Sequence, residues 1–140
     1  MAALGPYLKE IGGLVMGRVS YEQMRGFGPG PFDDIPTVVL TTNSKLQVGA
    51  SAQVCLEGPQ GAIDAIEKRI DGDIWLFGGG KTAACFLDEG LIELTVVPVV
   101  LGTGLPLFPG VRDPVTFELV SSRVGELGTV SMVYARRSDR

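Results

Sequence analysis

Apolar residues occur in short runs along the chain, separated by glycine, proline and charged residues. The run TVVLTT at residues 37–42 is rich in β-branched side chains and has no polar alternation. Such a run predicts a strand that is buried on both faces of a sheet. Similar patterns predict strands at residues 13–17, 37–42, 53–56, 74–77, 93–102, 117–124 and 129–137. The last two are separated by the turn sequence GELG and are expected to form a hairpin.

Helical spacing of apolar residues occurs between several of these strands. Ile63, Ile66 and Ile70 lie on one face of a predicted helix, and Ser20 is a candidate N-cap for another. Gly90 is expected just beyond the end of the helix that follows the glycines at 78–80. The predicted helices cover residues 2–11, 20–24 and 61–70, and a fourth follows the glycines at 78–80 and ends near residue 87.

The order of these elements predicts the fold class. Strands alternate with helices and the chain then ends in strands, which indicates an α/β protein with a mixed sheet. A chain of 140 residues is long enough for one domain with a sizeable core. We therefore expect a single domain over residues 1–140.

Composition narrows the classes of partner. The net charge is −4, from 12 basic and 16 acidic residues, and no basic patch is present, so a nucleic-acid partner is not expected. The longest apolar run, residues 94–102, is too short to cross a bilayer, so we expect a cytoplasmic protein without membrane contact. Cys55 and Cys85 are expected to be buried free thiols. The absence of histidine leaves no zinc site of the usual kind and no Ser-His or Cys-His catalytic pair.

The stretch DIWLFGGGKTAACFL at residues 73–87 places three glycines, a lysine and a threonine between a strand and a helix. Such a turn suggests a bound phosphate. A P-loop requires a glycine five residues before Gly80, and Trp75 stands there. Gly78, Gly80 and Ala83 do fit the Rossmann spacing, but the next strand ends in apolar residues and not in the expected acid.

Two further segments have the same layout. LVMGRVSYE at residues 14–22 passes from a strand through a glycine to a helix start, and VVLTTN at 38–43 ends a strand in hydroxyl and amide side chains. Parallel strands that end in this way would form a rim of hydrogen-bond donors at their carboxyl ends, where ligands bind in open α/β sheets. Taken singly, the three glycines favour a plain strand-to-helix turn in which Lys81 extends into solvent, and the segment at 14–22 alone also favours a plain turn.

In this order the three segments resemble dihydrofolate reductase and its relatives, including the reductase domain of bacterial riboflavin biosynthesis. The most specific stretch is IWLFGGGKTAACFLDEGLIELTVVPVVLGTGLPLF at residues 74–108, and VMGRVSYEQM and TVVLTT match the preceding turns. The ending FELVSSRV…TVSMVYARR is closer to the riboflavin-type relatives than to true folate reductases. The resemblance implies a mostly parallel central sheet flanked by helices.

The resemblance also implies a dinucleotide cofactor that lies across the strand ends. This cofactor is expected to be NADPH, and NADH stays open as an alternative. Carried over to this chain, the cofactor phosphates and ribose would meet Gly17, Arg18, Ser20, Thr41, Thr42, Asn43, Gly78, Gly79, Gly80, Lys81 and Thr82. Folate reductases hold the pair that corresponds to Gly78 and Gly79 in a cis peptide, so a cis bond is expected here. The relatives commonly dimerise, and we expect a homodimer built partly from residues 94–108. No catalytic residue is singled out.

The chain departs from the family in three respects. Family members often have a basic residue at the end of the strand that corresponds to residues 37–42. Here the first basic residue is Lys45, slightly later, so preference for a cofactor with a 2′-phosphate stays open. No arginine is placed to hold a folate tail, so folate is a poor substrate candidate. Relatives begin with a mid-sheet strand of the ISLDG kind, and this chain is expected to lack it and to be truncated at its N-terminus relative to the family. The strands at 37–42 and 74–77 are expected to border the place of that strand.

The leading hypothesis is an NAD(P)H-dependent reductase of a small heterocyclic substrate, such as a pyrimidine of riboflavin biosynthesis. The alternative is a non-catalytic nucleotide-binding or structural remnant that kept the scaffold. A dimeric interaction module without any ligand is a third reading. Cofactor titration separates the third from the other two, and turnover separates the first two.

Overall fold

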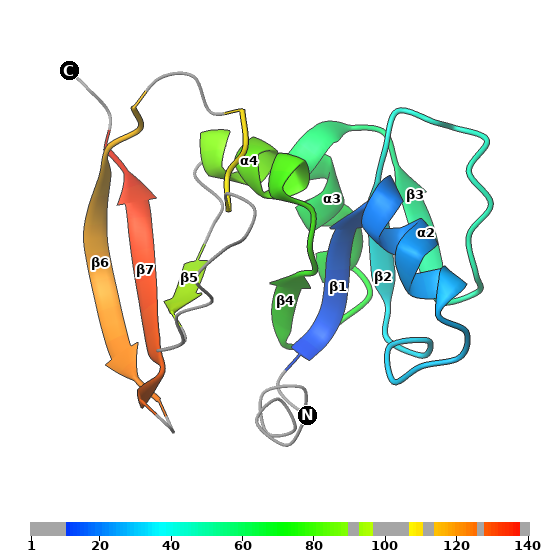
Figure 1. Ribbon diagram of the computed structural model, residues 1–140, viewed down its shortest axis with the longest axis horizontal. Helices are drawn as coiled ribbons and strands as arrows, with labels where there is room; N and C mark the ends of the chain where they lie inside the picture. Colours follow the sequence, from blue (N-terminus) through cyan, green and yellow to red (C-terminus); the bar gives the residue numbers. More distant parts are fainter. Residues whose placement is uncertain (1–10, 90–92, 97–106, 111–113, 126–127, 138–140) are drawn as a thin grey trace. The chain divides into compact units, whose positions relative to one another are not determined.

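The computed structural model describes residues 11–89, 93–96, 107–110, 114–125 and 128–137 (Figure 1). The chain forms two compact units, Met1–Thr82, here called unit 1, and Ala83–Arg140, called unit 2. Among the helices in these described ranges, none is long and apolar enough to cross a membrane.

Unit 1 contains a four-stranded sheet in which every strand is parallel to its neighbours, in the order β3-β2-β1-β4. The strands are β1 (Ile11–Gly17), β2 (Thr37–Leu40), β3 (Ala52–Cys55) and β4 (Asp73–Leu76). Most of β1 and β2 is fully buried, as their unbroken apolar sequences predict. These strands confirm the four expected in this region and the mixed α/β fold class, although β4 is only half-buried.

β1 lies at the centre of this sheet. It pairs with β2 on one side, where Gly17 is opposite Leu40, and with β4 on the other, where Val15 is opposite Leu76. The expectation that the second strand and β4 would border an open place in the sheet is therefore wrong. β1, at residues 11–17, lies between these two strands and pairs with both.

Two helices cover opposite faces of the sheet (Figure 1). α2 (Arg18–Gly26) buries Tyr21 in a cluster with Leu14, Met16 and Val39. α3 (Gly58–Glu67) buries Ala62 and Ile66 against the other face. Alternate residues of a strand point to opposite faces, so β1 supplies both clusters.

Ser20 was expected to cap α2, and this is wrong. β1 ends at Gly17 and the chain enters the helix at the next residue, so Gly17 is the N-cap and Ser20 lies inside the first turn. The helix expected over 61–70 is confirmed in part. It begins earlier, at Gly58, with Pro59 in its first turn, and ends at Glu67, so Ile70 lies outside it. Proline is favoured there because the first helical N–H groups have no partner within the helix.

Unit 2 contains an antiparallel three-stranded sheet in the order β5-β7-β6. Its strands are β5 (Glu93–Val96), β6 (Phe117–Val124) and β7 (Val130–Arg136). The pairing of β6 with β7 confirms the expected terminal hairpin. α4 (Gly80–Asp88) begins in unit 1 with its first three residues and continues into unit 2, where the Arg136 side chain donates a hydrogen bond to the Asp88 carbonyl oxygen.

The two cysteines differ in their exposure to solvent. Cys55 is buried at the end of β3 as expected, whereas Cys85 is exposed on α4, which corrects the expectation of burial. Phe86 takes the inward position on that helix, at 2% exposure. The helix expected over 2–11 is wrong at Ile11, which begins β1, and the rest of it lies outside the described residues. So do Gly90, the strand beyond Val96 and most of the expected dimer segment.

Tyr21 joins α2 to the loop between β2 and β3. Its side chain is 4% exposed and its hydroxyl oxygen accepts a hydrogen bond of 2.7 Å from the Gly49 N–H. Tyr21→Phe should lower the free energy of unfolding by about 1–2 kcal/mol, because a half-buried donor loses its partner. Denaturant titration followed by circular dichroism measures this loss.

Tyr134→Phe is the matched control. Among the described residues the Tyr134 hydroxyl donates to the Met132 sulfur, at 3.2 Å, and a thioether is a weak acceptor. Its removal should change stability by less than about 0.5 kcal/mol. Equal losses in both variants would contradict the role assigned to the Tyr21 hydroxyl.

Candidate cofactor site

Three of the predicted turns lie at one edge of the sheet in unit 1. β1, β2 and β4 are parallel neighbours, so the residues after their carboxyl ends emerge on the same side. Gly17 ends β1, Thr41 follows β2, and Phe77 and Gly78 follow β4. The register aligns these ends, since Leu40 lies opposite Gly17. This edge is where open α/β sheets bind their ligands.

The turn after β4 is made by Gly78 and Gly79, with φ angles of 75° and 88°. Side chains are disfavoured at such angles, so glycine is required at both positions. Both residues are exposed. The peptide between them is trans, and the expected cis bond is wrong. The positive φ angles of Gly78 and Gly79 turn the chain without a cis bond, and α4 then begins at Gly80.

Two hydroxyl groups face this turn. A Cβ atom placed on Gly79 would lie 3.2 Å from both Ser20 Oγ and Thr82 Oγ1, and one on Gly78 would lie 3.4 Å from Ser20 Oγ. A Cβ atom on Gly17 would overlap Thr82 Oγ1. The structure therefore brings together Gly17, Ser20, Gly78, Gly79 and Thr82, and this group is called the glycine cradle below.

Two helices begin at the glycine cradle. α2 starts directly after Gly17, and α4 starts directly after Gly79. No side chain caps the start of α2, and Gly79 has none to offer at the start of α4. The first N–H groups of a helix are free donors, and the helix dipole makes this end attract anions. Two such ends on neighbouring strands suit a ligand with two linked phosphates.

Charged side chains flank the glycine cradle. Lys81 and Arg18 are exposed and follow the two helix starts, which adds positive charge beside the N–H donors. Arg18 Nη1 also contacts Glu22 Oε2 at 2.6 Å, with the two side chains 44% and 48% exposed. Pairs this exposed contribute little to stability, so the Arg18 side chain can exchange partners at small cost.

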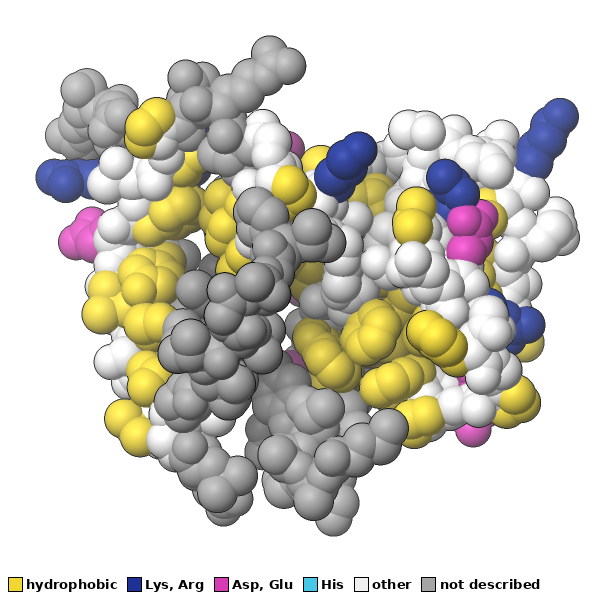
Figure 2. Space-filling view, viewed as in Figure 1, with side chains coloured by type: hydrophobic (Ala, Val, Ile, Leu, Met, Phe, Trp, Pro, Cys, Tyr) yellow, Lys and Arg dark blue, Asp and Glu magenta, His cyan; other side chains and the backbone are white. Residues whose placement is uncertain are grey.

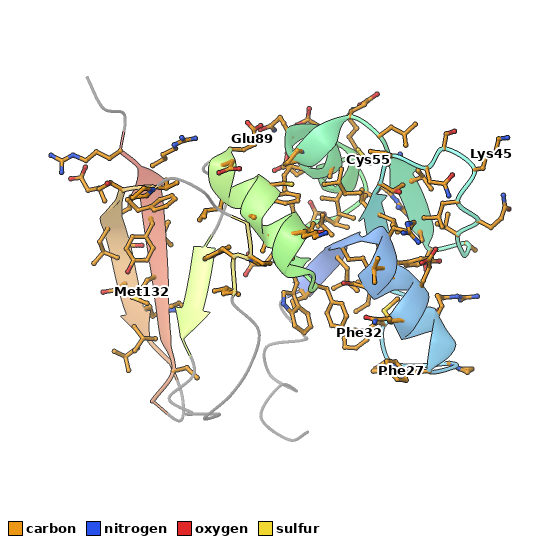
Figure 3. The ribbon with its side chains drawn as sticks, turned by 45° about the horizontal axis from the view of Figure 1, so that its top comes forward. Phe27, Phe32, Lys45, Cys55, Glu89 and Met132 are labelled. Carbon is orange, nitrogen blue, oxygen red and sulfur yellow. The ribbon has the colours of Figure 1, made fainter. Side chains whose placement is uncertain are left out.

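The residues after β2 form a separate turn. The Thr41 N–H donates to the Cys55 carbonyl at 3.0 Å, and Thr41 Oγ1 accepts from the Asn43 N–H at 3.1 Å. Asn43 Oδ1 accepts in turn from the Lys45 N–H at 3.0 Å. Thr42 is exposed between them. These residues share the edge with the glycine cradle, and the hydrogen bonds above run within the turn and to β3. Figure 3 shows Lys45 on the outer part of this loop.

An aromatic group that includes Phe77, the residue before Gly78, was missed by the sequence reasoning. Phe32, Trp75 and Phe77 form mutual ring contacts, with centroid distances of 6.0, 5.2 and 5.0 Å. Trp75 and Phe77 are alternate residues and therefore share one face of the β4 segment. Phe32 comes from the loop before β2, which the sequence had marked only as irregular. The alternation in IWLF was the signal that could have indicated a shared aromatic face.

The described residues offer no candidate metal site. Among the described residues, no group of three or more acidic, cysteine or histidine side chains is placed to hold a metal ion.

Comparison with known sequences gives a family match. The sequence model of the RibD C-terminal domain matches residues 31–131. The uncharacterized protein YyaP of Bacillus subtilis (strain 168) is 36% identical over 75 residues, which are 51% of this chain and 40% of YyaP. YwjB from the same organism, also uncharacterized, is 27% identical over 106 residues, 73% of this chain and 61% of YwjB. The chain thus spans less than two thirds of these relatives.

Two solved structures share the fold. A protein assigned to riboflavin biosynthesis from Shewanella sp. PV-4 superposes with a TM-score of 0.61 and 25% identity, over 99% of this chain and 79% of that chain. A diaminohydroxyphosphoribosylaminopyrimidine deaminase/5-amino-6-(5-phosphoribosylamino)uracil reductase from Thermotoga maritima gives a TM-score of 0.61 at 15% identity, over 98% of this chain and 50% of that chain. Both neighbours have the reductase-type fold expected from the sequence.

Proposed function

The chain belongs to the RibD C-terminal domain family, and from this premise we propose that it binds NADPH at the glycine cradle and reduces a small heterocyclic substrate. One observation supports this more than any other. Two helix starts without side-chain caps meet at Gly78 and Gly79, and Gly17 leaves room there that any side chain would fill. Such a cradle suits the pyrophosphate of a dinucleotide.

Each part of the cradle has a role in this proposal. The N–H groups at the starts of α2 and α4 donate to the pyrophosphate oxygens, and the Ser20 and Thr82 hydroxyl groups add donors at the same place. Arg18 and Lys81 supply positive charge at the rim. Thr41, Thr42 and Asn43 lie one strand away, where they would meet the adenosine ribose, with Lys45 as the nearest following cation for a 2′-phosphate. Gly80 is the first residue of α4, and its N–H group would be one of these donors.

The bound dinucleotide supplies a hydride to the substrate. The residues of the chain bind and orient the two molecules, and we assign none of them as the proton donor. A pyrimidine of riboflavin biosynthesis is the proposed substrate class, because the Thermotoga maritima structural neighbour is named as a reductase of such a pyrimidine. A cytoplasmic location and a homodimer stay predictions.

Two measurements test the proposal. Isothermal titration with NADPH and NADH reports binding, and loss of nicotinamide absorbance in the presence of 5-amino-6-(5-phosphoribosylamino)uracil reports turnover. We expect micromolar binding of NADPH and measurable turnover. Binding without turnover on this or related pyrimidines would favour the non-catalytic alternative. Failure of both cofactors to bind would reject the assignment of the cradle.

Arg18→Gln should weaken NADPH binding by about threefold at low salt, since an exposed cation beside a helix start contributes roughly 0.3–1 kcal/mol toward an anion. The difference from the unchanged protein should shrink at high salt, because exposed charges are screened. Titrations at two salt concentrations measure both effects.

The control is Arg25→Gln, in the last turn of the same helix and away from the cradle. It removes the same charge from the chain but should change the NADPH Kd by less than twofold. If the two variants behave alike, Arg18 acts only through net charge and its assignment to the site is wrong.

A further inference from the structure

Among the strands that the structure describes, β6 forms one edge of the three-stranded sheet in unit 2. It pairs with β7 on its inner side, and its outer backbone N–H and C=O groups face no described strand. All of its residues after Phe117 are exposed, including the apolar Leu119, Val120 and Val124 at 51%, 63% and 75%. An exposed edge of this kind is a template for pairing with a further strand.

A bulge interrupts β6 near its middle. The register with β7 shifts between Leu119 and Ser121, so Val120 is an extra residue on this strand. In a regular strand, residues five positions apart point to opposite faces of the sheet. One extra residue between two such positions brings their side chains to the same face.

Glu118 and Arg123 are placed in this way. They stand opposite Ala135 and Ser131 of β7, which are four positions apart and therefore share a face. Neither of these two opposite residues carries a charge. The carboxylate and the guanidinium group thus lie on one face of β6, at equal distances along the chain from the peptide bond that follows Val120.

The other face of β6 is apolar. Phe117 and Leu119 are alternate residues and share this face. Leu119 stands opposite Tyr134 of β7, and Val124 stands opposite Val130, four positions from Tyr134 and therefore on the same face. Figure 2 shows hydrophobic side chains gathered over β6 and β7. Each face of β6 therefore has a matched pair of residues, one on either side of the bulge.

We propose that β6 pairs with β6 of a second copy of this chain, antiparallel and around a two-fold axis at the bulge. Glu118 of each copy then lies opposite Arg123 of the other, which forms two ion pairs on one face. Phe117 of each copy lies opposite Val124 of the other on the apolar face, an aromatic and β-branched pair of the kind that stabilises strand pairing. The two three-stranded sheets become one continuous sheet.

The charges of β6 favour a second copy over an unrelated strand. Charged side chains and bulges often discourage pairing at an edge, and lysine and proline are common there for the same reason. β6 has neither lysine nor proline, and its two charges have opposite signs at symmetric positions, so the edge is complementary to itself. This contact lies outside residues 94–108, where the sequence predicted a dimer, and it does not depend on the proposed cofactor.

Charge reversal tests the pairing in the full chain. Sedimentation velocity over micromolar concentrations measures the dimer Kd, and circular dichroism checks that each variant is folded. Glu118→Arg and Arg123→Glu each place like charges opposite one another twice, and each should raise the dimer Kd about tenfold or more. The control is Glu67→Arg, an exposed position on α3, which should leave the Kd within about twofold.

Two restorations separate the proposed pairing from a general effect of the substitutions. The double variant with Glu118→Arg and Arg123→Glu again has opposite charges across the axis and should dimerise as the unchanged protein does. An equimolar mixture of the two single variants should also dimerise, because one copy then presents two cations to the two anions of the other. A protein that stays monomeric, a dimer that the single variants leave unchanged, or single variants that do not recover when mixed would each overturn the proposal.

Discussion

Replacing Gly79 with alanine is expected to weaken NADPH binding by at least about tenfold, a loss of roughly 1.4 kcal/mol of binding free energy. The added Cβ would lie 3.2 Å from both Ser20 Oγ and Thr82 Oγ1, in the space between the two hydroxyl groups. A phosphate oxygen must approach the same donors, so the methyl group competes with the ligand. Isothermal titration of the purified variant measures the change.

Gly28→Ala separates this effect from backbone strain. Gly28 has φ 83°, close to the 88° of Gly79, but a Cβ atom there would meet nothing within 4 Å. Both variants should lose about 1 kcal/mol of stability, since each places a side chain at positive φ. Only Gly79→Ala should lose NADPH affinity. Equal affinities in the two variants would show that the turn after β4 does not hold the cofactor.

Gly17→Val is expected to abolish measurable NADPH binding and to lower stability by about 1–3 kcal/mol through overpacking. Gly17 has φ −78° and ψ 159°, an extended conformation that any residue adopts, so the backbone is not the obstacle. The obstacle is Thr82 Oγ1, which the new side chain would overlap. Relief of the overlap requires the Thr82 side chain to rotate or the starts of α2 and α4 to separate. In either case the donors at the cradle no longer converge on one anion as they do now.

A double-mutant cycle tests this cause. Gly17→Ala, Thr82→Ala and the double variant are compared by chemical denaturation. If the overlap is the source of the loss, the alanine at position 17 should cost less in the Thr82→Ala background, with a coupling above about 0.5 kcal/mol. Additive effects would place the cost elsewhere and would remove the geometric basis of the cradle.

Several parts of this protein follow from the sequence alone. The strands predicted at residues 37–42 and 13–17 are readable because a parallel strand buried on both faces needs unbroken apolar side chains. The hairpin of β6 and β7 is readable because its two β-rich segments are separated only by a short turn. The residues GGGKT after an apolar strand likewise predict an anion-tolerant helix start, since this depends on local backbone freedom.

Other features depend on segments that are distant in sequence. The neighbour of Ser20 is Gly79, which comes from the turn after β4 and could not be read from the sequence around Ser20. The position of Cys85 could not be read from its own helix, because burial depends on which face of α4 meets another element. The central place of β1 was missed for the same reason, since an apolar strand fits equally well beside several others.

The sequence by itself determined which segments become strands and helices and which turns can accept an anion, because these depend on side-chain type and local backbone preference. Only the tertiary structure decided that β1 lies beside β4, that Gly17 and Gly79 approach the same Thr82 hydroxyl, and that Phe32 joins Trp75 and Phe77. The physical reason is that strand order and side-chain contacts are selected by the packing of the whole core. No local pattern contains that information.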